Sequence, residues 1–231
     1  MTTTATQDTS IGTIPITLSS QASVVAEKRY FLKNDDNEVI EDAPTMFRRV
    51  ADAIAAVETQ YGKLAIDAQL SSNEFYTIMS NLDFIPNSPT LMNAGTKQGT
   101  LSACFVLPLE DSMEGIMKAA HDTAMVQKFG GGTGFALSNL RPRGDRIKTT
   151  HGISCGPIEV LKTLSRVSSM ITQGGKRDGA NMAVMDIHHP DILEFIDCKK
   201  VEGEIHNFNI SVGVTDDFMK AVKAGTNYPL I

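Results

Sequence analysis

The feature that most constrains the fold is an alternation of short strand-like segments with helical patterns from about residue 90 onward. Apolar segments such as SACFVLPL, GFALS, NMAVM and FNISVGV are separated by amphipathic stretches. Each of these stretches has a helical length of about ten to eighteen residues. This order predicts α/β units with parallel strands, because a helix between two strands returns the chain to the same edge of the sheet.

The chain divides into three regions by pattern. Residues 1–25 are rich in Thr and Ser and are expected to form a flexible arm. Residues 26–85 are expected to be mainly helical: TMFRRVADAIAAVETQYG has Thr45 as a candidate N-cap, and SNEFYTIMSNL is a second helical segment. Residues 86–231 carry the α/β pattern and end in the strand-like NYPLI. We interpret this end as a cut through a larger fold, the alternative being an ordinary C-terminal strand.

Composition excludes several classes of protein. The net charge is −6 and the basic residues are scattered, which argues against binding to a nucleic-acid backbone. The three cysteines, Cys104, Cys155 and Cys198, form no CxxC pair, so neither a structural zinc site nor a disulfide framework is expected. The sequence shows no signal peptide and no apolar segment of membrane-spanning length. We therefore expect a cytoplasmic protein without a metal site.

Cys104 lies in the segment TLSACFVLPLEDS, among apolar residues and just before an acidic turn. Free cysteine is among the most buried residue types, so the local sequence favours a core position over a reactive thiol. Cys155 and Cys198 have no basic neighbours that would activate them and are expected to be buried. The sequence HHPD at residues 188–191 resembles a metal motif but is better explained as a turn that starts a helix.

Two glycine-rich segments are candidates for ligand binding. KFGGGTGF at residues 128–135 lets backbone N–H groups converge on an anion, although a tight helix-to-strand turn explains it equally well. QGGKRDGANM at residues 173–182 adds basic and amide side chains that suit a phosphate and a base, with a solvated connection as the alternative. Neither segment is a Walker or Rossmann motif. Between them, DSMEGIMKAAHDTAMVQKF predicts a helix with an apolar stripe.

Taken together, five segments resemble the ribonucleotide reductase large chain, most of all its adenosylcobalamin-dependent class II type. They are NSPTLMNAG, LSACFVLPLEDSMEGI, GGGTGFALSNLRPRGD, TQGGKRDGANMAV and the HPDILEFIDCKK to NFNISVGVTDDFM block, and they occur in the family's order. The resemblance covers residues 28–231. It implies an N-terminal helical part followed by the first half, about five parallel strands, of a ten-stranded α/β barrel.

The resemblance also implies roles for individual residues in the reduction of ribonucleoside diphosphates or triphosphates by thiyl-radical chemistry. Cys104 matches one cysteine of the pair that reduces the substrate and becomes a disulfide. Ser88 matches a hydroxyl that contacts the substrate, and Ala103 and Gly132 match positions whose backbone approaches it. Adenosylcobalamin is the implied cofactor, without any contact residue assigned in this chain.

A deoxynucleoside triphosphate effector site is implied as well. Asp111, with Ser112 beside it, matches the residue that holds the effector's sugar, and Arg141 and Lys148 fall where its phosphates are expected. Gln173, Lys176 and Arg177 fall in the loop that links the effector base to the substrate base. The helix from Ser112 to Phe129 resembles the family's dimer surface, although its Met-rich stripe also suits an internal core.

The family's radical cysteine, its neighbouring glutamate and the disulfide partner of Cys104 have no match here. We therefore expect the chain to be inactive alone and to need a complementary C-terminal reductase segment. Three alternatives stay open: a catalytically dead nucleotide-binding module, a class I large chain that uses a di-iron or manganese radical, and an unrelated α/β enzyme with a Cys104 nucleophile.

Overall fold

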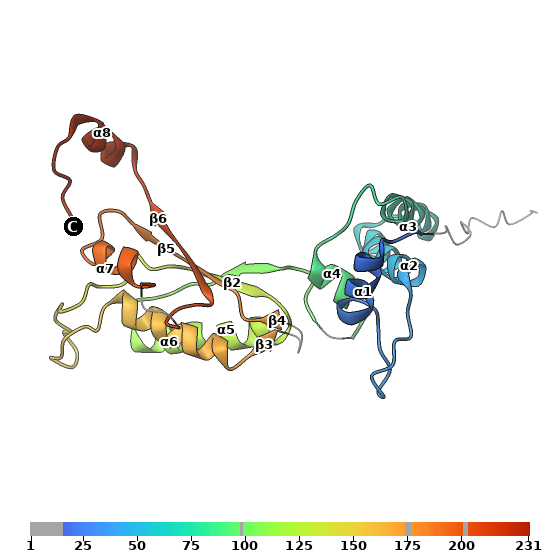
Figure 1. Cartoon of the computed structure of the whole chain (residues 1–231), viewed down its shortest axis with the longest axis horizontal. Coiled ribbons are helices and arrows are strands. Elements are labelled where there is room, and N and C mark those ends of the chain that lie inside the picture. The colour runs from blue at the N-terminus through green and yellow to red at the C-terminus, as the bar shows by residue number, and fades with distance from the viewer. Residues whose placement is uncertain (1–15, 98, 174–176, 201–202) are drawn as a thin grey trace, which may run out of the picture. The chain divides into compact units, whose positions relative to one another are not determined.

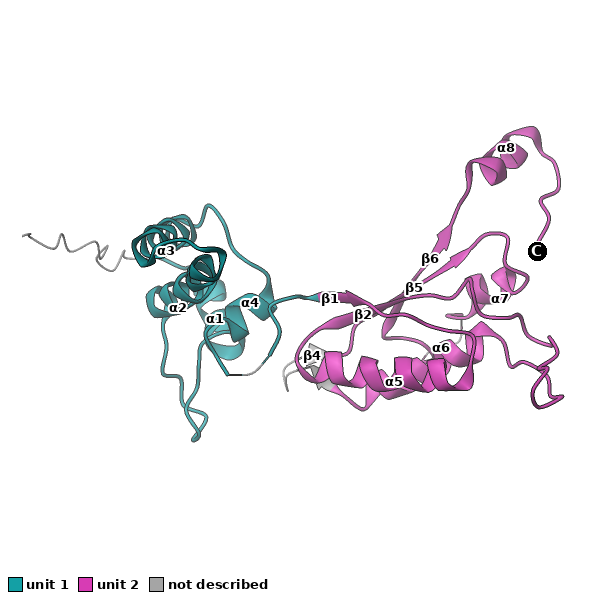
Figure 2. Ribbon diagram, turned by 180° about the vertical axis from the view of Figure 1, so that it is seen from behind, with its two compact units in different colours: residues 1–103 teal, residues 104–231 magenta. Residues whose placement is uncertain are grey.

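The structure is a computed structural model that describes residues 16–97, 99–173, 177–200 and 203–231. It divides the chain into two compact units, Met1–Ala103 and Cys104–Ile231 (Figure 2). The expected boundary between the helical and the α/β region lay earlier, at residues 85 and 86. We call the first unit the helical unit and the second the sheet unit.

The helical unit is built around the packing of two helices, α2 and α3. Met46, Phe47 and Val50 project from one face of α2 and pack with Tyr76 and Met79 of α3, and all five are buried. Their spacing on α2 is that of an amphipathic helix with one apolar face. The described elements are α1 (Ser20–Arg29), α2 (Ala43–Ala55), the 3-10 helix η1 (Ala56–Tyr61), α3 (Ala65–Ser80) and α4 (Ser88–Asn93).

Three local features differ from the expectations. The helix α1 begins at Ser20, inside the region expected to be an arm, because the Ser19 hydroxyl caps it. Asp42, not Thr45, is the N-cap of α2: the Asp42 carboxylate accepts the Thr45 N–H, and the Thr45 hydroxyl accepts the Asp42 N–H in a capping box. NSPTLMN, assigned by its sequence to the α/β region, instead contains the short helix α4 of the helical unit, which Asn87 caps.

The sheet unit confirms the predicted α/β class. Its four main strands lie in the order β1-β2-β5-β6, and every neighbouring pair is parallel. Figure 1 shows the helices α5 and α6 side by side along one side of this sheet. The elements are β1 (Cys104–Val106), α5 (Met113–Lys128), β2 (Gly132–Ala136), α6 (Pro157–Ser169), β3 (Thr172–Gln173), β4 (Arg177–Asp178), β5 (Asn181–Asp186), α7 (Ile192–Asp197), β6 (Phe208–Gly213) and α8 (Asp216–Ala224).

The strand count and the C-terminus depart from the expectation. The described residues contain four parallel strands rather than about five, and β3 and β4 form a separate antiparallel pair that we call the β3–β4 ribbon. NYPLI is not a strand. The Ile231 N–H donates to the His188 carbonyl at 2.7 Å, and a single backbone hydrogen bond does not make a strand ladder.

The core of the sheet unit lies between one face of the sheet and the helices. Phe135, Met185 and Phe208 point from this face toward Leu161 and Leu164 of α6, and all are buried. Residues alternate between the two faces of a strand, so the residues between these core positions lie on the opposite face. That opposite face has no helix packed on it among the described residues of the unit, and we call it the open face.

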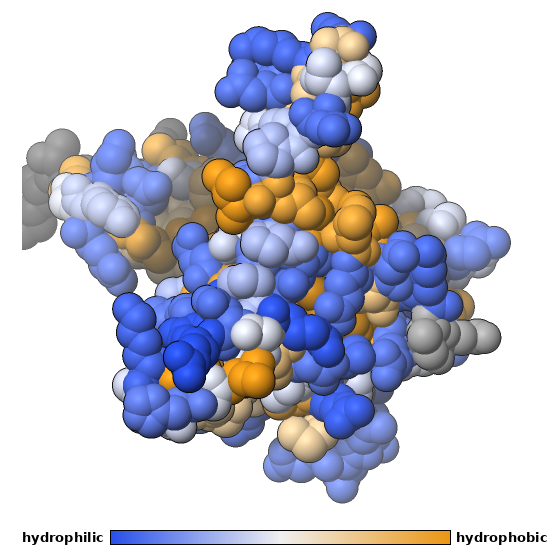
Figure 3. Space-filling model, turned by 90° about the vertical axis from the view of Figure 1, so that its left-hand side faces the viewer, coloured by the Kyte–Doolittle hydropathy of each residue, from blue (hydrophilic) through white to orange (hydrophobic). Residues whose placement is uncertain are grey.

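Part of the unit's apolar surface is exposed. Figure 3 views the sheet unit from one end and shows a patch of apolar residues beneath the projecting top of the molecule. Exposed apolar side chains occur on α7 at Leu193 and Ile196, and on α8 at Met219 and Val222. In the part of the chain that the structure describes, no helix has both the length and the apolar composition needed to cross a membrane.

Candidate functional site

Cys104 lies on the open face, at the edge strand β1. Its register partner on β2 is Gly132, and the next outward-facing pair is Val106 with Gly134. Cys104 is exposed, which contradicts the core position that its local sequence favoured. Its neighbour Phe105 points to the helix side, where its ring takes the space that a Cβ of Gly131 would need, 2.7 Å from the ring. The strand alternation therefore presents the thiol outward next to a residue without a side chain.

Small residues continue across the open face. Gly134 is in register with Met182, and Ala136 with Val184. On β6, the exposed Asn209 and Ser211 pair with Met182 and Val184. The open face thus carries glycine, alanine and methionine between the Cys104 thiol on the β1 side and an amide and a hydroxyl on the β6 side. Where the residues are glycine or alanine, a flat polar ligand can approach the backbone closely.

Two further candidate residues belong to the helical unit. Ser88 is the first residue of α4, and its hydroxyl is hydrogen-bonded to the Tyr30 hydroxyl at 3.0 Å. Ala103 is half-buried and immediately precedes Cys104. Ser88 retains partial exposure, so its hydroxyl has hydrogen-bonding capacity beyond the bond to Tyr30.

The helix α4 is held at its C-terminus by a buried ion pair. The Arg49 guanidinium donates to both Glu41 carboxylate oxygens, at 2.7 and 2.9 Å. It also donates to the carbonyls of Leu91 and Ala94, which are the unpaired acceptors at the end of the helix. This clamp was not foreseen, because Arg49 and α4 are more than forty residues apart. It fixes the segment that carries Ser88.

Asp111, Arg141 and Lys148 come together in one pocket of about 350 Å³, which is otherwise lined by residues 145–147 and Thr149. Arg141 donates from Nε to the Asp111 carboxylate at 2.7 Å and from its backbone N–H at 3.3 Å. The lining carries three cationic side chains and two carboxylates, so it has a small positive excess. Ser112, beside it, caps α5 by accepting the Gly115 N–H at 3.0 Å.

The other three predicted effector residues do not share this pocket. Gln173 and Arg177 are register partners in the β3–β4 ribbon, and Lys176 lies outside the described residues. The ribbon is near the C-terminal end of α5, whereas Asp111 precedes its N-terminus. A helix of 16 residues is about 24 Å long, which sets the scale of this separation within one chain.

A buried polar network at the C-terminal end of α5 was missed by sequence reasoning. Gln127 is fully buried, and its amide nitrogen donates to the Ser168 hydroxyl at 3.0 Å and to Asn181 Oδ1 at 2.7 Å. The Thr133 hydroxyl donates to the same Asn181 oxygen. The sequence carries only a weak signal for this network: Gln127 follows Thr123 by four residues, so both lie on one helix face, and the structure shows Thr123 fully buried.

Cys155, Cys198 and His189 lie outside the candidate sites described above. Cys155 is exposed, contrary to expectation. Cys198 is partly buried at the C-cap of α7, where burial raises the pKa of its thiol. The buried His189 accepts the Asp191 N–H at Nδ1 and donates from Nε2 to the Leu140 carbonyl, so HHPD is indeed a turn before a helix. The described residues contain no group of three side chains suited to hold a metal ion.

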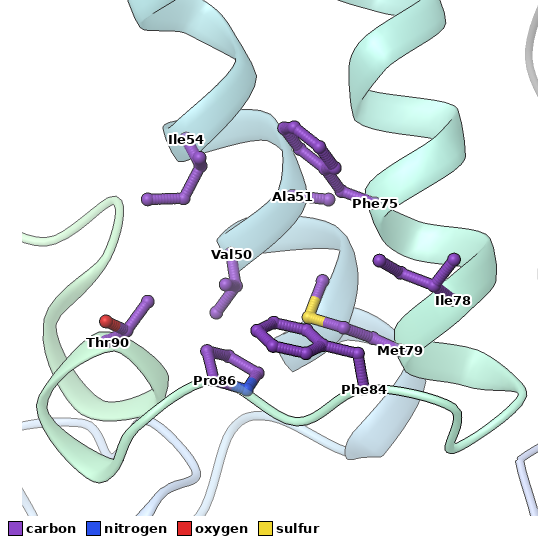
Figure 4. A pocket seen from close by; sticks show the side chains of 9 residues that line it. All are labelled: Val50, Ala51, Ile54, Phe75, Ile78, Met79, Phe84, Pro86 and Thr90. Carbon is purple, nitrogen blue, oxygen red and sulfur yellow. The ribbon is translucent and has the colours of Figure 1, made fainter.

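An apolar pocket of about 310 Å³ lies in the helical unit. Figure 4 shows Val50, Met79, Phe84 and Pro86 around it, with Thr90 at one side. Its lining has no charged side chain, so it offers no contact for a phosphate or a carboxylate.

Comparisons with known proteins agree with this architecture. A family model described as "Ribonucleotide reductase, barrel domain" matches residues 102–231, and one described as "Ribonucleotide reductase, all-alpha domain" matches residues 17–99. The two matches follow the division into sheet unit and helical unit, within a few residues of Ala103.

Individual relatives are similar over most of the chain. A protein of Thermoplasma acidophilum named "Vitamin B12-dependent ribonucleoside-diphosphate reductase" is 42% identical over 87% of this chain and 33% of its own length. A protein of Mycobacterium tuberculosis with the same name is 41% identical over 93% of this chain and 31% of its own. The chain therefore spans about a third of the length of these relatives.

A solved structure, the Actinobacillus ureae class Id ribonucleotide reductase alpha subunit, matches with a TM-score of 0.72 and 27% identity. The match covers 90% of this chain and 35% of that one.

Proposed function

The chain belongs to the ribonucleotide reductase large-subunit family, and from this premise we propose that it contributes to the reduction of ribonucleoside diphosphates to deoxyribonucleotides in a B12-dependent enzyme. The observation that carries the proposal is the exposed Cys104 thiol, in register with Gly132 on the open face of a parallel sheet. It is supported by 41–42% identity to relatives named vitamin B12-dependent ribonucleoside-diphosphate reductases.

Cys104 is proposed to deliver reducing equivalents to the substrate ribose. Two thiols give up two electrons and two protons as they form a disulfide. The substrate loses its 2′ hydroxyl as water and gains hydrogen at that carbon, so atoms and electrons balance. Neither Cys155 nor Cys198 matches the residue that forms the disulfide with Cys104 in the family. We therefore assign the second thiol to the part of the relatives' sequence that lies outside these 231 residues.

The substrate is proposed to lie over the glycines of the open face. Its ribose would approach the backbone at Gly132, where no side chain intervenes. For the helical unit we propose separately, from the resemblance of their segments, that the Ser88 hydroxyl and the Ala103 backbone are substrate contacts. Tyr30 supports the role of Ser88, because its hydroxyl fixes the rotamer of the Ser88 hydroxyl.

Adenosylcobalamin is proposed for the complete enzyme, where it supplies the radical that starts the reaction. The residues described here do not fit it: the pockets of about 310 and 350 Å³ are much smaller than a corrin ring, and one is wholly apolar. We therefore assign no cobalamin contact to this chain. The class I alternative is less well supported, since the Actinobacillus ureae class Id alpha subunit is 27% identical, against 41–42% for the relatives named vitamin B12-dependent.

The pocket around Asp111 is proposed to bind a deoxynucleoside triphosphate. The Asp111 carboxylate, oriented by Arg141, has lone pairs left for a sugar hydroxyl, and Lys148 with Arg146 provides positive charge for phosphates. The ribbon that carries Gln173 and Arg177 lies at the other end of α5. We therefore infer that two copies, with antiparallel α5 helices, bring one copy's pocket to the other copy's ribbon.

The exposed side chains of α5 support this pairing. Met113, Met117 and Met125 are 68%, 48% and 41% exposed and recur at intervals of four and eight residues, so they form an apolar stripe that the exposed His121 interrupts between Met117 and Met125. The stripe suits a contact between two copies of the helix.

The proposed function is tested by complementation. The chain is mixed with the remaining segment of a vitamin B12-dependent relative, adenosylcobalamin, a dithiol and a ribonucleoside diphosphate, and deoxynucleotide is measured by chromatography. Product is expected from the wild type and none from Cys104→Ser, while Cys155→Ser serves as the matched thiol control. No product where the intact relative is active would overturn the proposal. Nucleotide binding without product would instead favour a binding module.

A further inference from the structure

A buried polar network sits at the point where the β3–β4 ribbon rejoins the sheet. Ser168 lies near the end of α6, before the ribbon, and Asn181 is the first residue of β5, after it. Gln127 of α5 reaches both, with its amide nitrogen 3.0 Å from Ser168 Oγ and 2.7 Å from Asn181 Oδ1. One side chain therefore ties together the two ends of the segment that leaves and re-enters the sheet.

The network extends to the strand that carries Gly132. The Thr133 hydroxyl donates to Asn181 Oδ1, and the Asn181 amide nitrogen donates to Ser168 Oγ at 3.0 Å and to the Asn207 carbonyl at 3.2 Å. All four side chains are at most 5% exposed, so no bond is shared with bulk solvent. The start of β5 is thus fixed to α5, α6 and β2 at once.

Gly179 passes directly against the Gln127 side chain. A Cβ atom built there would lie 2.7 Å from Gln127 Oε1 and 3.1 Å from the Ser168 carbonyl, so no other residue fits without displacing one of them. Gln127 Oε1 is buried and accepts no hydrogen bond within the described residues. An unpaired buried acceptor costs free energy, and a small shift of the adjacent backbone or a water would satisfy it.

We propose that Gln127 is a positioning residue for nucleotide selection: its buried amide sets the backbone of residues 179–181, and through them the ribbon, so that its loss weakens discrimination between nucleotide bases. The proposal rests on the proposed function, which gives the ribbon a role in reading a base. The same helix begins beside the Asp111 pocket, so α5 connects the phosphate-binding end to the ribbon end.

The test replaces Gln127 with Met, which has nearly the same length and no amide. Thr123→Ala is the matched control: Thr123 is equally buried one turn earlier on α5, and its hydroxyl donates only to the Ala119 carbonyl of its own helix. Gly179→Ala perturbs the same contact from the ribbon side and leaves the amide in place. Thermal unfolding by circular dichroism establishes that each variant folds.

Two quantities are measured on the 231-residue chain. Hydrogen exchange of the peptide over residues 170–182 is expected to accelerate in Gln127→Met and Gly179→Ala, and not in Thr123→Ala. Calorimetry gives the dissociation constants of the four deoxynucleoside triphosphates, and the ratio of the weakest to the tightest constant measures discrimination between bases. This ratio is expected to fall by roughly fivefold or more in the same two variants, which is the factor that one lost buried hydrogen bond accounts for. Affinity for inorganic triphosphate is expected to stay within about twofold, since the Asp111 pocket is untouched.

The outcomes separate the two proposals. If the wild type binds none of the four nucleotides, the proposed effector site fails, and the selection role of Gln127 fails with it. If the wild type discriminates between bases and folded Gln127→Met and Gly179→Ala discriminate equally well, the inference about Gln127 is wrong and the proposed function stands.

Discussion

Cys104 and Gly132 are register partners on the parallel strands β1 and β2, so the thiol lies on the open face beside a residue with no side chain. The alternation of faces along β1 causes this arrangement, because Phe105 takes the helix side and leaves Cys104 and Val106 outside. An apolar neighbourhood in the sequence therefore does not bury this cysteine.

Alkylation of the native chain is expected to separate the three thiols. Cys104 and Cys155 are exposed and should react with iodoacetamide quickly at pH 7.5. Cys198 is partly buried and its pKa is raised by burial, so it has less thiolate at this pH and should react more slowly. Mass spectrometry of the labelled peptides gives the three rates. In urea the three rates should converge, whereas equal rates in the native chain would contradict this assignment.

Gly131 and Gly134 form a matched pair for testing the packing beside Cys104. A Cβ at Gly131 would lie 2.7 Å from both Phe105 and Val126 side-chain atoms, so Gly131→Ala should destabilise the chain by about 1–3 kcal/mol through overpacking. At Gly134 the nearest atoms are 3.9 Å away, an ordinary contact, so Gly134→Ala should be nearly neutral. Urea unfolding, followed by circular dichroism, gives the free energy of unfolding of both variants. Equal losses of this free energy would show that the Phe105 side chain moves aside to make room for the added Cβ.

The fold was predictable where local pattern and packing agree. The helix α2 within TMFRRVADAIAAVETQYG and the helix α5 within DSMEGIMKAAHDTAMVQKF both follow from the sequence and are confirmed. The helix α4 was missed because it is only six residues long and its C-terminus depends on Arg49, far away in sequence. NYPLI was mistaken for a strand because apolar composition specifies no pairing partner.

The structure brings some of the predicted effector residues together and separates others, and the sequence alone does not give this grouping. Asp111 and Arg141 are 30 residues apart, yet they form a direct ion pair, as shared ligand chemistry would suggest. Gln173 and Arg177 were placed with them, although the length of α5 separates the two groups within one chain. The Gln127–Asn181 contact spans 54 residues, and a glutamine near a helix end carries only a weak local sign of burial.

The Arg49–Glu41 pair is expected to be a major stabiliser of the helical unit. The side chains are 13% and 6% exposed, so Arg49→Ala removes the counter-ion of a buried carboxylate, which keeps the Leu32 N–H as a donor, and also removes the donor of two helix carbonyls. The expected loss is about 3–5 kcal/mol. Arg49→Lys should recover only part of it, because an ammonium cannot replace the bidentate contact.

Urea unfolding at 222 nm, where the helical unit contributes strongly, measures this loss. Lys220→Ala is the control, since it breaks a fully solvent-exposed pair with Asp217 and should change nothing measurable. A loss for Arg49→Ala as small as that of the control would mean that the Leu32 N–H, which already donates to Glu41, is enough to hold the carboxylate.

The capping box of α2 gives a pH-dependent prediction. Hydrogen bonds from the Thr45 side chain and then the Thr45 backbone N–H lower the pKa of Asp42. A lowered pKa in the folded state means that the stabilisation is complete above the ordinary aspartate pKa and is lost as the pH falls through the folded value. Asp42→Ala should therefore cost about 0.5–1 kcal/mol at pH 5–8, the low range for an exposed cap, and progressively less below about pH 4.

Asp42→Asn separates the cap from its charge. The asparagine carbonyl still accepts the Thr45 N–H, so this variant should lose little stability, and its difference from Asp42→Ala should not depend on pH. Urea unfolding curves of the three chains between pH 3 and 8 give these differences, in which the titration of all other carboxylates cancels. If the stability lost in Asp42→Ala stays constant down to pH 3, the charge of Asp42 contributes nothing. The helix would then depend on the shape of the Asp42 side chain and not on its charge.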